Sequence, residues 1–321
     1  MLYRFLKILV SFAIRIFCRR IIINKPSLLN EKGPLLLASN HPNSFLDSVI
    51  LDTLFDEPVW SLARGDVFKN KIAIRILTSL KILPVYRTSE GVENLAENYK
   101  TFNDCIDLFR KDAVIMIFSE GKCINEWHLR QLKKGTARLA IRAWQENIPL
   151  RVLPVGINYS SFRRFGKNIR INFGNIISKE DVDLNKSEGL RHQSFNNNLQ
   201  QQFQQLVFEI SSTDKKKQKE LLEIKPSLIT QILLAVPAAF GFLLHAPLYL
   251  LVKSFTWKRT NHNDHYDSIM TAILLFAYPI YLLLVTLLLF ALFESWYVFV
   301  LLLILPFSAW SYVQLKPQLD K

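Results

Sequence analysis

Cysteine is scarce in this chain of 321 residues, which contains only Cys18, Cys105 and Cys123. The three lie far apart, their number is odd, and neither a C-x-x-C pair nor a Cys/His ligand spacing occurs. The sequence therefore argues against a disulfide framework, and we interpret the three as reduced thiols facing the cytosol. No catalytic-cysteine signature surrounds Cys123, so a core or loop position is the preferred interpretation for it.

Glycine-rich signatures are absent as well. The chain has no G-x-G-x-x-G, no G-x-x-x-x-G-K-[ST] and no G-x-S-x-G, so dinucleotide-binding, P-loop and serine-hydrolase functions lack their usual sequence support.

Acidic residues are fewer than basic ones, 27 against 40, and the net charge is +13. This excess favours anionic partners such as nucleic acid, an acidic membrane surface or phosphorylated substrates. Because membrane segments are also present, we expect the last two and no nucleic-acid partner.

Half of the chain is apolar, and the apolar residues concentrate after Leu228. This distribution indicates a soluble-type domain followed by a membrane-associated tail. At the other end, basic residues interrupt the apolar series from Met1 to Ile23 every few positions. An amphipathic helix in the membrane interface fits this pattern better than a secretory signal, because no cleavage site follows. We therefore predict an interface helix at 1–32, a globular domain at 33–225 and a membrane region at 226–321.

Within the predicted domain, short apolar runs alternate with longer segments of helical character. The predicted strands are Leu35–Ser39, Val59–Ala63, Ile82–Tyr86, Ala113–Phe118, Arg151–Ile157 and Ile169–Phe173. The predicted helices are Ser44–Leu54, Ile72–Leu80, Val92–Lys111 and Gly135–Glu146. Such alternation is typical of an α/β fold with a largely parallel sheet flanked by helices. Farther on, Phe195, Leu199 and Phe203 recur at helical spacing and predict a surface helix packed on the domain.

The first candidate site follows the first predicted strand, where residues 40–47 read N-H-P-N-S-F-L-D. His41 falls just beyond the strand and Asp47 in the helix that follows, at the edge where α/β sheets usually do chemistry. A carboxylate on one imidazole nitrogen leaves the other free to accept a proton, so the pair can act as a general base. The alternative is that His41 lies in a turn and Asp47 on a solvated helix face.

Two further stretches lie just beyond predicted strands. Residues 84–87 read P-V-Y-R and end in Arg87, whose planar guanidinium suits a phosphate. Residues 118–122 read F-S-E-G-K, with Glu120 and Gly121 in a turn where glycine permits close approach of a ligand. A cationic cluster follows, at the start of a helix whose N-terminal amides also favour anions, and comprises Lys122, Arg130, Lys133, Lys134 and Arg138. A surface arginine, a plain β-turn and a solvated charged face are the respective alternatives.

Taken together and in this order, these stretches resemble the motifs of the glycerolipid acyltransferase family, whose members acylate glycerol 3-phosphate or lysophosphatidic acid. That family carries an N-H-x-x-x-x-D motif, a second motif with a substrate-binding arginine, an F-P-E-G-T-R-like motif and a late V-P-[IV]-like motif. The matching residues here are 40–47, 84–87, 118–122 and 153–155, the last reading L-P-V. The similarity extends over roughly residues 33–175 and implies that the predicted domain is an acyltransferase domain.

The chain departs from the family pattern in its first and third motifs. Five residues separate His41 from Asp47, where most of the family has four, and one extra helical residue rotates a side chain by about 100°. The loop after His41 must absorb this rotation if the pair is to meet. Some glycerol-3-phosphate and dihydroxyacetone-phosphate acyltransferases resemble the chain in this spacing, which favours a first acylation. Ser119 replaces the usual proline, and Lys122 stands where threonine or serine is common, with no arginine after it.

The resemblance implies an O-acyltransferase of phospholipid synthesis that moves a fatty acyl group from an acyl thioester to a glycerol-phosphate-type acceptor. The thioester would be acyl-CoA or acyl-carrier protein. His41 would be the general base, oriented by Asp47. The acceptor would be bound by Arg87, Glu120 and Gly121, and its phosphate also by Lys122, Arg130 or Lys133. A thioester has a good leaving group because the pKa of a thiol is about 8.5. We therefore expect no covalent enzyme nucleophile, no metal and no cofactor.

Three apolar segments follow the domain, at Leu228–Val252, Ile269–Phe293 and Trp296–Tyr312. Two prolines and a glycine interrupt the first, so we predict a broken interfacial or re-entrant element there. The second and third segments are joined by two residues and predict a transmembrane hairpin. This arrangement keeps the lysine clusters on one side, in accord with the positive-inside tendency. It predicts a multi-pass membrane protein in contact with membrane lipids, with its catalytic domain facing the cytoplasm.

Between the first two apolar segments lie His262, Asp264, His265 and Asp267. Two histidines with nearby acids can bind a metal, but no further ligand pattern accompanies them, and a solvated juxtamembrane loop is the preferred interpretation.

Two alternatives to the acyltransferase function of the whole protein also remain open. One is acylation of another lysophospholipid, which the identity of the consumed acceptor would reveal. The other is a non-catalytic membrane module that binds lipids, for which replacement of His41 would leave cellular function intact.

Overall fold

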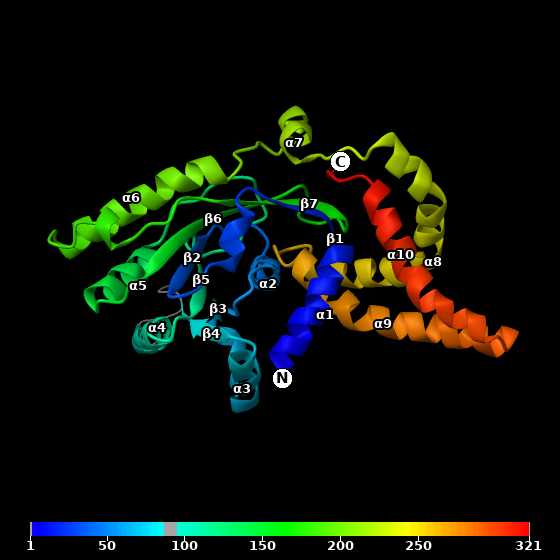
Figure 1. Cartoon of the computed structure of the whole chain (residues 1–321), viewed down its shortest axis with the longest axis horizontal. Coiled ribbons are helices and arrows are strands. Elements are labelled where there is room, and N and C mark those ends of the chain that lie inside the picture. Colours follow the sequence, from blue (N-terminus) through cyan, green and yellow to red (C-terminus); the bar gives the residue numbers. More distant parts are fainter. Residues whose placement is uncertain (1, 87–94, 321) are drawn as a thin grey trace.

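Parallel strands buried on both faces form the centre of the molecule (Figure 1). The computed structural model describes residues 2–86 and 95–320. The strands are β1 (Cys18–Ile23), β2 (Leu35–Ser39), β3 (Val59–Arg64), β4 (Ile82–Val85), β5 (Val114–Phe118), β6 (Arg151–Tyr159) and β7 (Lys167–Phe173). They form one seven-stranded sheet in the order β1-β7-β6-β2-β5-β3-β4. Each neighbouring pair is parallel except β6 and β7, which are antiparallel. The predicted α/β class is confirmed.

Helices cover both faces of the sheet. The helices of the domain are α1 (Leu2–Phe17), α2 (Phe45–Leu54), α3 (Lys71–Ser79), α4 (Leu95–Phe109), α5 (Lys134–Gln145), α6 (Glu188–Leu206) and α7 (Lys215–Leu222). Short 3-10 turns occur at Pro26–Asn30, Gly65–Val67 and Lys179–Asp181. Helices α4, α5 and α6 pack on one face and α1 and α2 on the other. Leu36 of β2 therefore points into the first layer and Leu37 into the second, and both are fully buried.

The predicted elements between β2 and β7 occur with shifts of a few residues at their ends, and the first three residues of the predicted helix Val92–Lys111 lie outside the residues that the structure describes. The predicted surface helix is also present, because Phe195, Leu199 and Phe203 of α6 are fully buried against α5 and the sheet. A sheet with helices on both faces requires strands that are apolar on both sides. This is why the uninterrupted apolar runs of the sequence identify its strands.

The N-terminal segment differs from the predicted helix over its last residues. Helix α1 ends at Phe17, and the chain continues as β1, the edge strand of the sheet. Ile21 and Ile23 of β1 pair with residues of β7, and β-branched side chains favour such a strand over a helix. The first part of α1 keeps its amphipathic character, with Phe5 and Ile8 exposed to solvent. Its location in the membrane interface stays a prediction.

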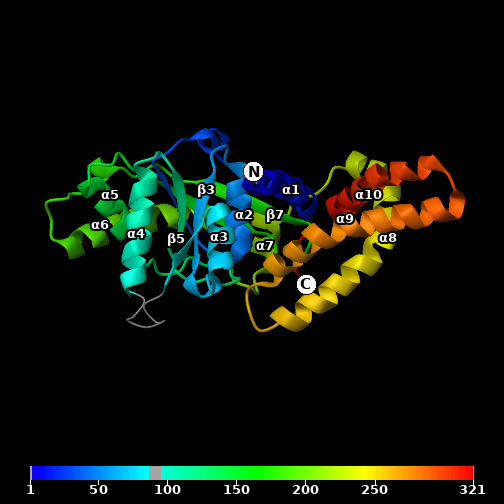
Figure 2. The same ribbon diagram turned by 90° about the horizontal axis from the view of Figure 1, so that it is seen from below.

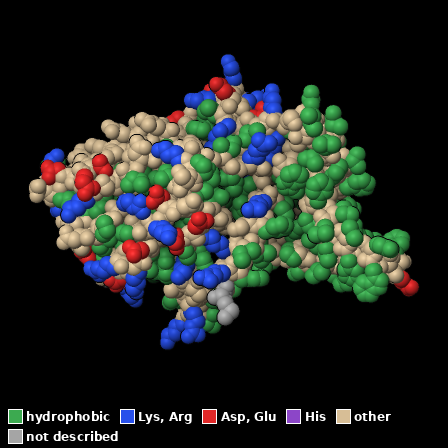
Figure 3. Space-filling model, viewed as in Figure 1, with side chains coloured by type: hydrophobic (Ala, Val, Ile, Leu, Met, Phe, Trp, Pro, Cys, Tyr) green, Lys and Arg blue, Asp and Glu red, His purple; other side chains and the backbone are tan. Residues whose placement is uncertain are grey.

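Three long apolar helices form the C-terminal region, at α8 (Leu228–Thr260), α9 (Tyr266–Phe293) and Trp296–Leu315, the last composed of η6 (Trp296–Val300) and α10 (Leu301–Leu315). Each is long and apolar enough to cross a membrane. They extend to one side of the sheet (Figure 2). Hydrophobic side chains gather over this region, whereas most charged side chains lie over the sheet domain (Figure 3). These features fit membrane association, and the number of crossings and the orientation stay predictions.

The first apolar segment is one helix in the structure, although the sequence predicts an interruption. Helix α8 contains Pro237 and Pro247 and continues to Thr260, and it changes direction along its length (Figure 1). Proline inside a helix removes a hydrogen bond and bends the axis. The two helices of the predicted hairpin follow one another directly, because α9 and η6 are separated only by Glu294 and Ser295, and their crossing of a membrane stays a prediction.

The close approach of α6 to β6 generates a stability prediction. A Cβ added at Gly156 in β6 would lie 2.5 Å from the backbone oxygen of Leu206, whereas one added at Gly189 in α6 would meet nothing within 4 Å. We expect Gly156→Ala to lower the free energy of unfolding by about 1–3 kcal/mol through overpacking. Gly189→Ala should be neutral or stabilising by up to about 1 kcal/mol, because alanine favours helix. Thermal unfolding of the two variants in the same detergent measures this, and equal midpoints would contradict the packing described.

Candidate active site

The predicted motifs lie at the carboxyl edge of the sheet. Strands β2, β3, β4 and β5 are parallel, so the residues that follow them emerge at one edge. His41 follows β2 and Glu120 follows β5. Arg87 comes two residues after β4, but it lies outside the residues that the structure describes. The late motif, Leu153–Val155, lies within β6 and pairs with Leu37–Ser39 just before the first motif.

The structure brings His41 and Asp47 together. Nδ1 of His41 lies 2.9 Å from Oδ2 of Asp47, and the Asp47 side chain is fully buried while 17% of the His41 side chain is exposed. An ionised carboxylate only accepts hydrogen bonds, so Nδ1 carries the proton and donates it to Asp47. In the neutral imidazole, Nε2 of His41 then carries no proton and can accept one. The imidazole also stacks on the Phe118 ring, with centroids 3.7 Å apart, which fixes its plane.

The loop between the two residues absorbs the additional residue of the motif. Ser44, which precedes α2, has φ 54°, in the region that side-chain-bearing residues rarely adopt. Its carbonyl accepts the Asp47 N–H at 3.2 Å, and the Asn43 N–H donates to Oδ2 of Asp47 at 2.8 Å. The unusual turn at Ser44 thus rotates the start of α2 until its acid meets the histidine.

Tyr159 completes the set of donors to Asp47. Its hydroxyl, at the end of β6, donates to Oδ1 of Asp47 at 2.7 Å. Burial first, and then the Asp47 charge, raises the pKa of Tyr159 well above its ordinary value, so the hydroxyl stays protonated and donates. The Asp47 carboxylate therefore accepts from a ring nitrogen, a backbone amide and a phenol. Tyr159 was not among the predicted site residues, because its role depends on a contact 112 residues away in the chain.

The backbone beside His41 is held by two buried polar side chains. The Asn40 amide exchanges two hydrogen bonds with the backbone of Ile157, at 3.0 and 2.7 Å. The Glu120 carboxylate accepts the His41 N–H at 2.8 Å and the Arg130 N–H at 2.9 Å. Burial raises the pKa of Glu120 and the two amide bonds oppose that rise. Glu120 thus joins the first motif to the cationic segment, and its contact with the acceptor stays a prediction.

The cationic residues divide into paired and unpaired groups. Nε of Arg130 donates to Glu126 at 2.5 Å. Lys122 and Lys133 are exposed, and among the described residues neither forms an ion pair. Lys133 precedes α5, and its backbone N–H donates to Ser119 O at 2.7 Å. Gly121 has φ +67°, and a Cβ there would lie 3.1 Å from Cγ of Lys133. The turn at Gly121 therefore keeps Lys133 close to the strand end.

Serine at position 119 also has a local explanation. The Thr136 hydroxyl, in the first turn of α5, donates to the Ser119 hydroxyl at 3.0 Å, and both residues are buried. The Ser119 N–H donates to Ser39 O at 2.8 Å. A proline at 119 would lack this amide hydrogen. The departure from the family motif therefore adds a link between β2, β5 and α5.

Residues at the start of α9 also belong to the site, although the sequence suggested a solvated loop. His265 contacts Ser44, and Asp267 is 1% exposed and accepts from Asn43. The solvated interpretation is wrong for Asp267, whereas His265 is exposed. No group of three or more His, Cys, Asp or Glu side chains in the described part of the chain could hold a metal ion. The polar residues of this segment are compatible with a buried turn and with a solvated one, so the sequence could not distinguish the two.

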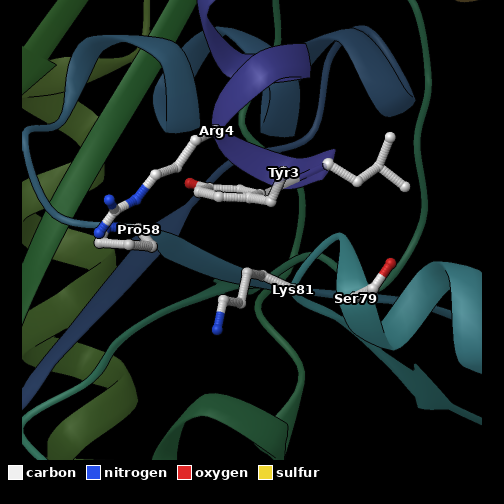
Figure 4. A pocket seen from close by; sticks show the side chains of 6 residues that line it. Tyr3, Arg4, Pro58, Ser79 and Lys81 are labelled. Carbon is white, nitrogen blue, oxygen red and sulfur yellow. The ribbon is translucent and has the colours of Figure 1, made fainter.

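The grooves beside α1 lie away from this site. One, of about 380 Å³, is lined by Leu2, Tyr3, Arg4, Pro58, Ser79 and Lys81 (Figure 4). Pro58 and Lys81 immediately precede β3 and β4, so this groove lies at the amino edge of the sheet. The predicted motifs lie at the opposite edge, and the groove is therefore not part of the candidate site.

Comparison with known proteins agrees with the motif pattern. Residues 20–158 match a family model described as Acyltransferase. No curated protein matches the chain. Among solved structures, the chain is similar to the 1-acyl-sn-glycerophosphate (LPA) acyltransferase PlsC from Thermotoga maritima. The two sequences are 14% identical and the TM-score is 0.45, and the match covers 63% of this chain and 78% of that chain. The matched range of the family model includes His41, Asp47 and Glu120.

The cysteines generate a pH prediction. Burial raises the pKa of Cys18 and of Cys105 to about 12, and burial followed by the Asp47 charge raises the pKa of Cys123. Because alkylation requires the thiolate, raised pKa values keep all three thiols protonated at pH 8. We expect the folded protein to react with iodoacetamide at least tenfold more slowly at pH 8 than the denatured protein, and faster as pH rises further. Peptide mass spectrometry identifies each site, and rapid native labelling of Cys123 would indicate an activated thiol instead.

Proposed function

Because residues 20–158 match a family model described as Acyltransferase, we propose that this protein transfers a fatty acyl group from an acyl thioester to the hydroxyl of a glycerol-phosphate-type acceptor at the membrane. The observation that carries the proposal is the buried Asp47 carboxylate against Nδ1 of His41. It leaves the second imidazole nitrogen as a base at the carboxyl edge of the sheet. That is the group an acyl transfer to an alcohol requires.

The reaction follows from this arrangement. Nε2 of His41 accepts the proton of the acceptor hydroxyl as its oxygen attacks the thioester carbonyl. The Asp47 carboxylate stabilises the imidazolium that forms, through the Nδ1 hydrogen bond. When the tetrahedral intermediate collapses, the carbon–sulfur bond breaks and the imidazolium returns its proton to the leaving thiolate. The products are an ester and a free thiol, and no acyl-enzyme is needed.

The cations near Gly121 are the proposed site of the acceptor phosphate. Lys122 and Lys133 are exposed and have no carboxylate partner among the described residues, whereas Arg130 is already paired with Glu126. Lys133 also precedes α5, whose first amides favour an anion. Lys122 and Lys133 are therefore better placed than Arg130 to meet a phosphate. Arg87 keeps its predicted role as a further phosphate ligand.

The membrane region would present the site to lipid substrates. The apolar helices α8 to α10 extend from the domain, and α9 contacts the loop that follows His41. We propose that α9 and α10 cross the membrane as a hairpin and that the domain faces the cytoplasm, where acyl thioesters of either donor type are available. A fatty acyl chain could then stay in the lipid layer while its thioester reaches His41.

Replacement of His41 tests the proposed chemistry. Purified protein in detergent is assayed with palmitoyl-CoA and either glycerol 3-phosphate or lysophosphatidic acid, in parallel with His41→Ala. We expect a loss of at least about 100-fold in kcat, because general-base catalysis contributes about 10²–10⁴. His128→Ala is the matched control, since His128 is a surface histidine paired with Glu209.

The outcomes of this assay are distinct. Preference for one acceptor names the reaction, and consumption of a different lysophospholipid favours the alternative acceptor. Activity restored only by an acyl-carrier-protein donor identifies the donor class. If wild type and His41→Ala are equally inert with every donor and acceptor, the acyltransferase proposal fails and a lipid-binding module becomes the better explanation.

Replacement of Lys133 tests the phosphate site. We expect Lys133→Ala to raise KM for the phosphorylated acceptor at least tenfold, because a hydrogen bond to a charged group contributes about 1.5–3 kcal/mol. The KM for the acyl thioester should change little. Lys216→Ala, at an exposed position in α7, is the control for loss of one surface charge. An unchanged acceptor KM in Lys133→Ala would remove Lys133 from the site.

A further inference from the structure

The first turn of α9 is bonded to the catalytic loop, residues 41–47. Nδ1 of His265 lies 2.5 Å from Oγ of Ser44, and the Asn43 side chain donates to Asp267 at 2.7 Å. The Ser268 hydroxyl accepts the Leu46 N–H at 3.1 Å. Asn43, Ser44 and Leu46 thus contact one turn at the start of a candidate membrane helix, more than 220 residues away in the chain. We call residues 265–268 the α9 turn.

Ser268 supplies the cap that α2 otherwise lacks. Ser44 precedes α2, yet its side chain makes no capping hydrogen bond, because its positive φ and its contact with His265 direct it elsewhere. The first amides of a helix have no partner within that helix. Ser268 accepts the amide of Leu46, the second residue of α2, which is the bond an N-cap side chain normally makes. Capping of the helix that carries Asp47 therefore comes from another helix.

Asp267 is anchored below the catalytic loop. It pairs with Lys167 of β7, and both side chains are buried, at 1% and 0% exposure. The Lys167 ammonium also lies 5.8 Å from the centre of the Tyr159 ring, and Tyr159 holds Asp47. The contacts form a closed ring that runs from Asp47 through Asn43, Asp267, Lys167 and Tyr159 back to Asp47.

A buried ion pair is a poor source of stability, because desolvation of two charges consumes most of their attraction. Apolar packing would fasten α9 to the domain equally well. What this pair provides is a fixed orientation of the Asp267 side chain, since Lys167 and Asn43 both donate to its Oδ2. A strained residue such as Ser44 also persists only where its surroundings determine its conformation.

We propose that the α9 turn is a positioning element of the active site. Ser268, Asp267 and His265 hold the lengthened catalytic loop in the conformation in which Asp47 meets His41. Acyl transfer therefore depends on a membrane helix being seated against α2. This inference rests on the proposed acyltransferase function, and it assigns none of the three residues a contact with substrate.

Two variants and their matched controls test the proposal in the full-length protein. Ser268→Ala removes the cap of α2, and Ser268→Thr keeps the hydroxyl. His265→Ala removes the contact with Ser44, and His262→Ala changes an exposed histidine of the same connection. We expect Ser268→Ala and His265→Ala to lower kcat at least tenfold with KM values within about twofold of wild type. Ser268→Thr should recover most of the loss, and His262→Ala should match wild type.

Cys123 provides a readout that does not require activity. Its Sγ accepts the Ser44 N–H at 2.9 Å and lies 4.0 Å from Asp264 O, between the catalytic loop and the residue before the α9 turn. If that turn holds the loop, Ser268→Ala and His265→Ala should speed iodoacetamide labelling of Cys123 several-fold. His262→Ala should label at the wild-type rate.

The two readouts separate failure of this inference from failure of the proposed function. If wild type transfers acyl groups and His41→Ala does not, but kcat and labelling in Ser268→Ala and His265→Ala equal those in His262→Ala, the positioning role is overturned. A kcat that falls only in proportion to the unfolded fraction, with no recovery in Ser268→Thr, overturns it too. If wild type is inert with every substrate while labelling still responds, the acyltransferase function fails, and the link between the α9 turn and the loop stands.

Discussion

The buried carboxylate of Asp47 is the constraint on which the site depends. A charge with no exposure to water is tolerated only when its lone pairs are occupied by donors. Asp47 obtains them from His41, from the Asn43 amide and from the Tyr159 hydroxyl. These donors lie on two different segments, the loop after β2 and the end of β6, so satisfying one carboxylate fixes the loop, the sheet and the helix relative to one another. The proton on Nδ1 of His41 follows from the same requirement.

Much of the fold could be predicted because it depends on local patterns. Runs such as Leu35–Leu37 are apolar on successive residues, as a strand buried on both faces requires. Strand β1 was missed because its isoleucines continue the apolar series of α1, and only pairing with β7 distinguishes the two states. The antiparallel β6–β7 pair was not predicted for a similar reason, since the sequence shows where strands are but not which edges meet.

The same division applies to the site. His41, Asp47 and Glu120 were found because their spacing within short motifs carries the information. Tyr159 and Asp267 were not, because they approach Asp47 and Asn43 across 112 and 224 residues of sequence. The sequence around Asp267 was also misleading, since an acidic residue next to an apolar helix usually lies in water at the end of that helix. Here Lys167, a buried cation on β7, reverses that expectation.

The additional residue between His41 and Asp47 connects these observations. It would turn the acid away by about 100° in a regular helix, and the chain corrects this with a left-handed turn at Ser44 that costs about 1–3 kcal/mol. Contacts from outside residues 41–47 also hold this turn, because the Ser44 side chain contacts His265 and the Leu46 amide donates to Ser268. The lengthened motif and the first turn of α9 are therefore parts of one structure. Under the proposed positioning role, the membrane region does more than retain the domain at the lipid surface, because the α9 turn also contacts Asn43, Ser44 and Leu46.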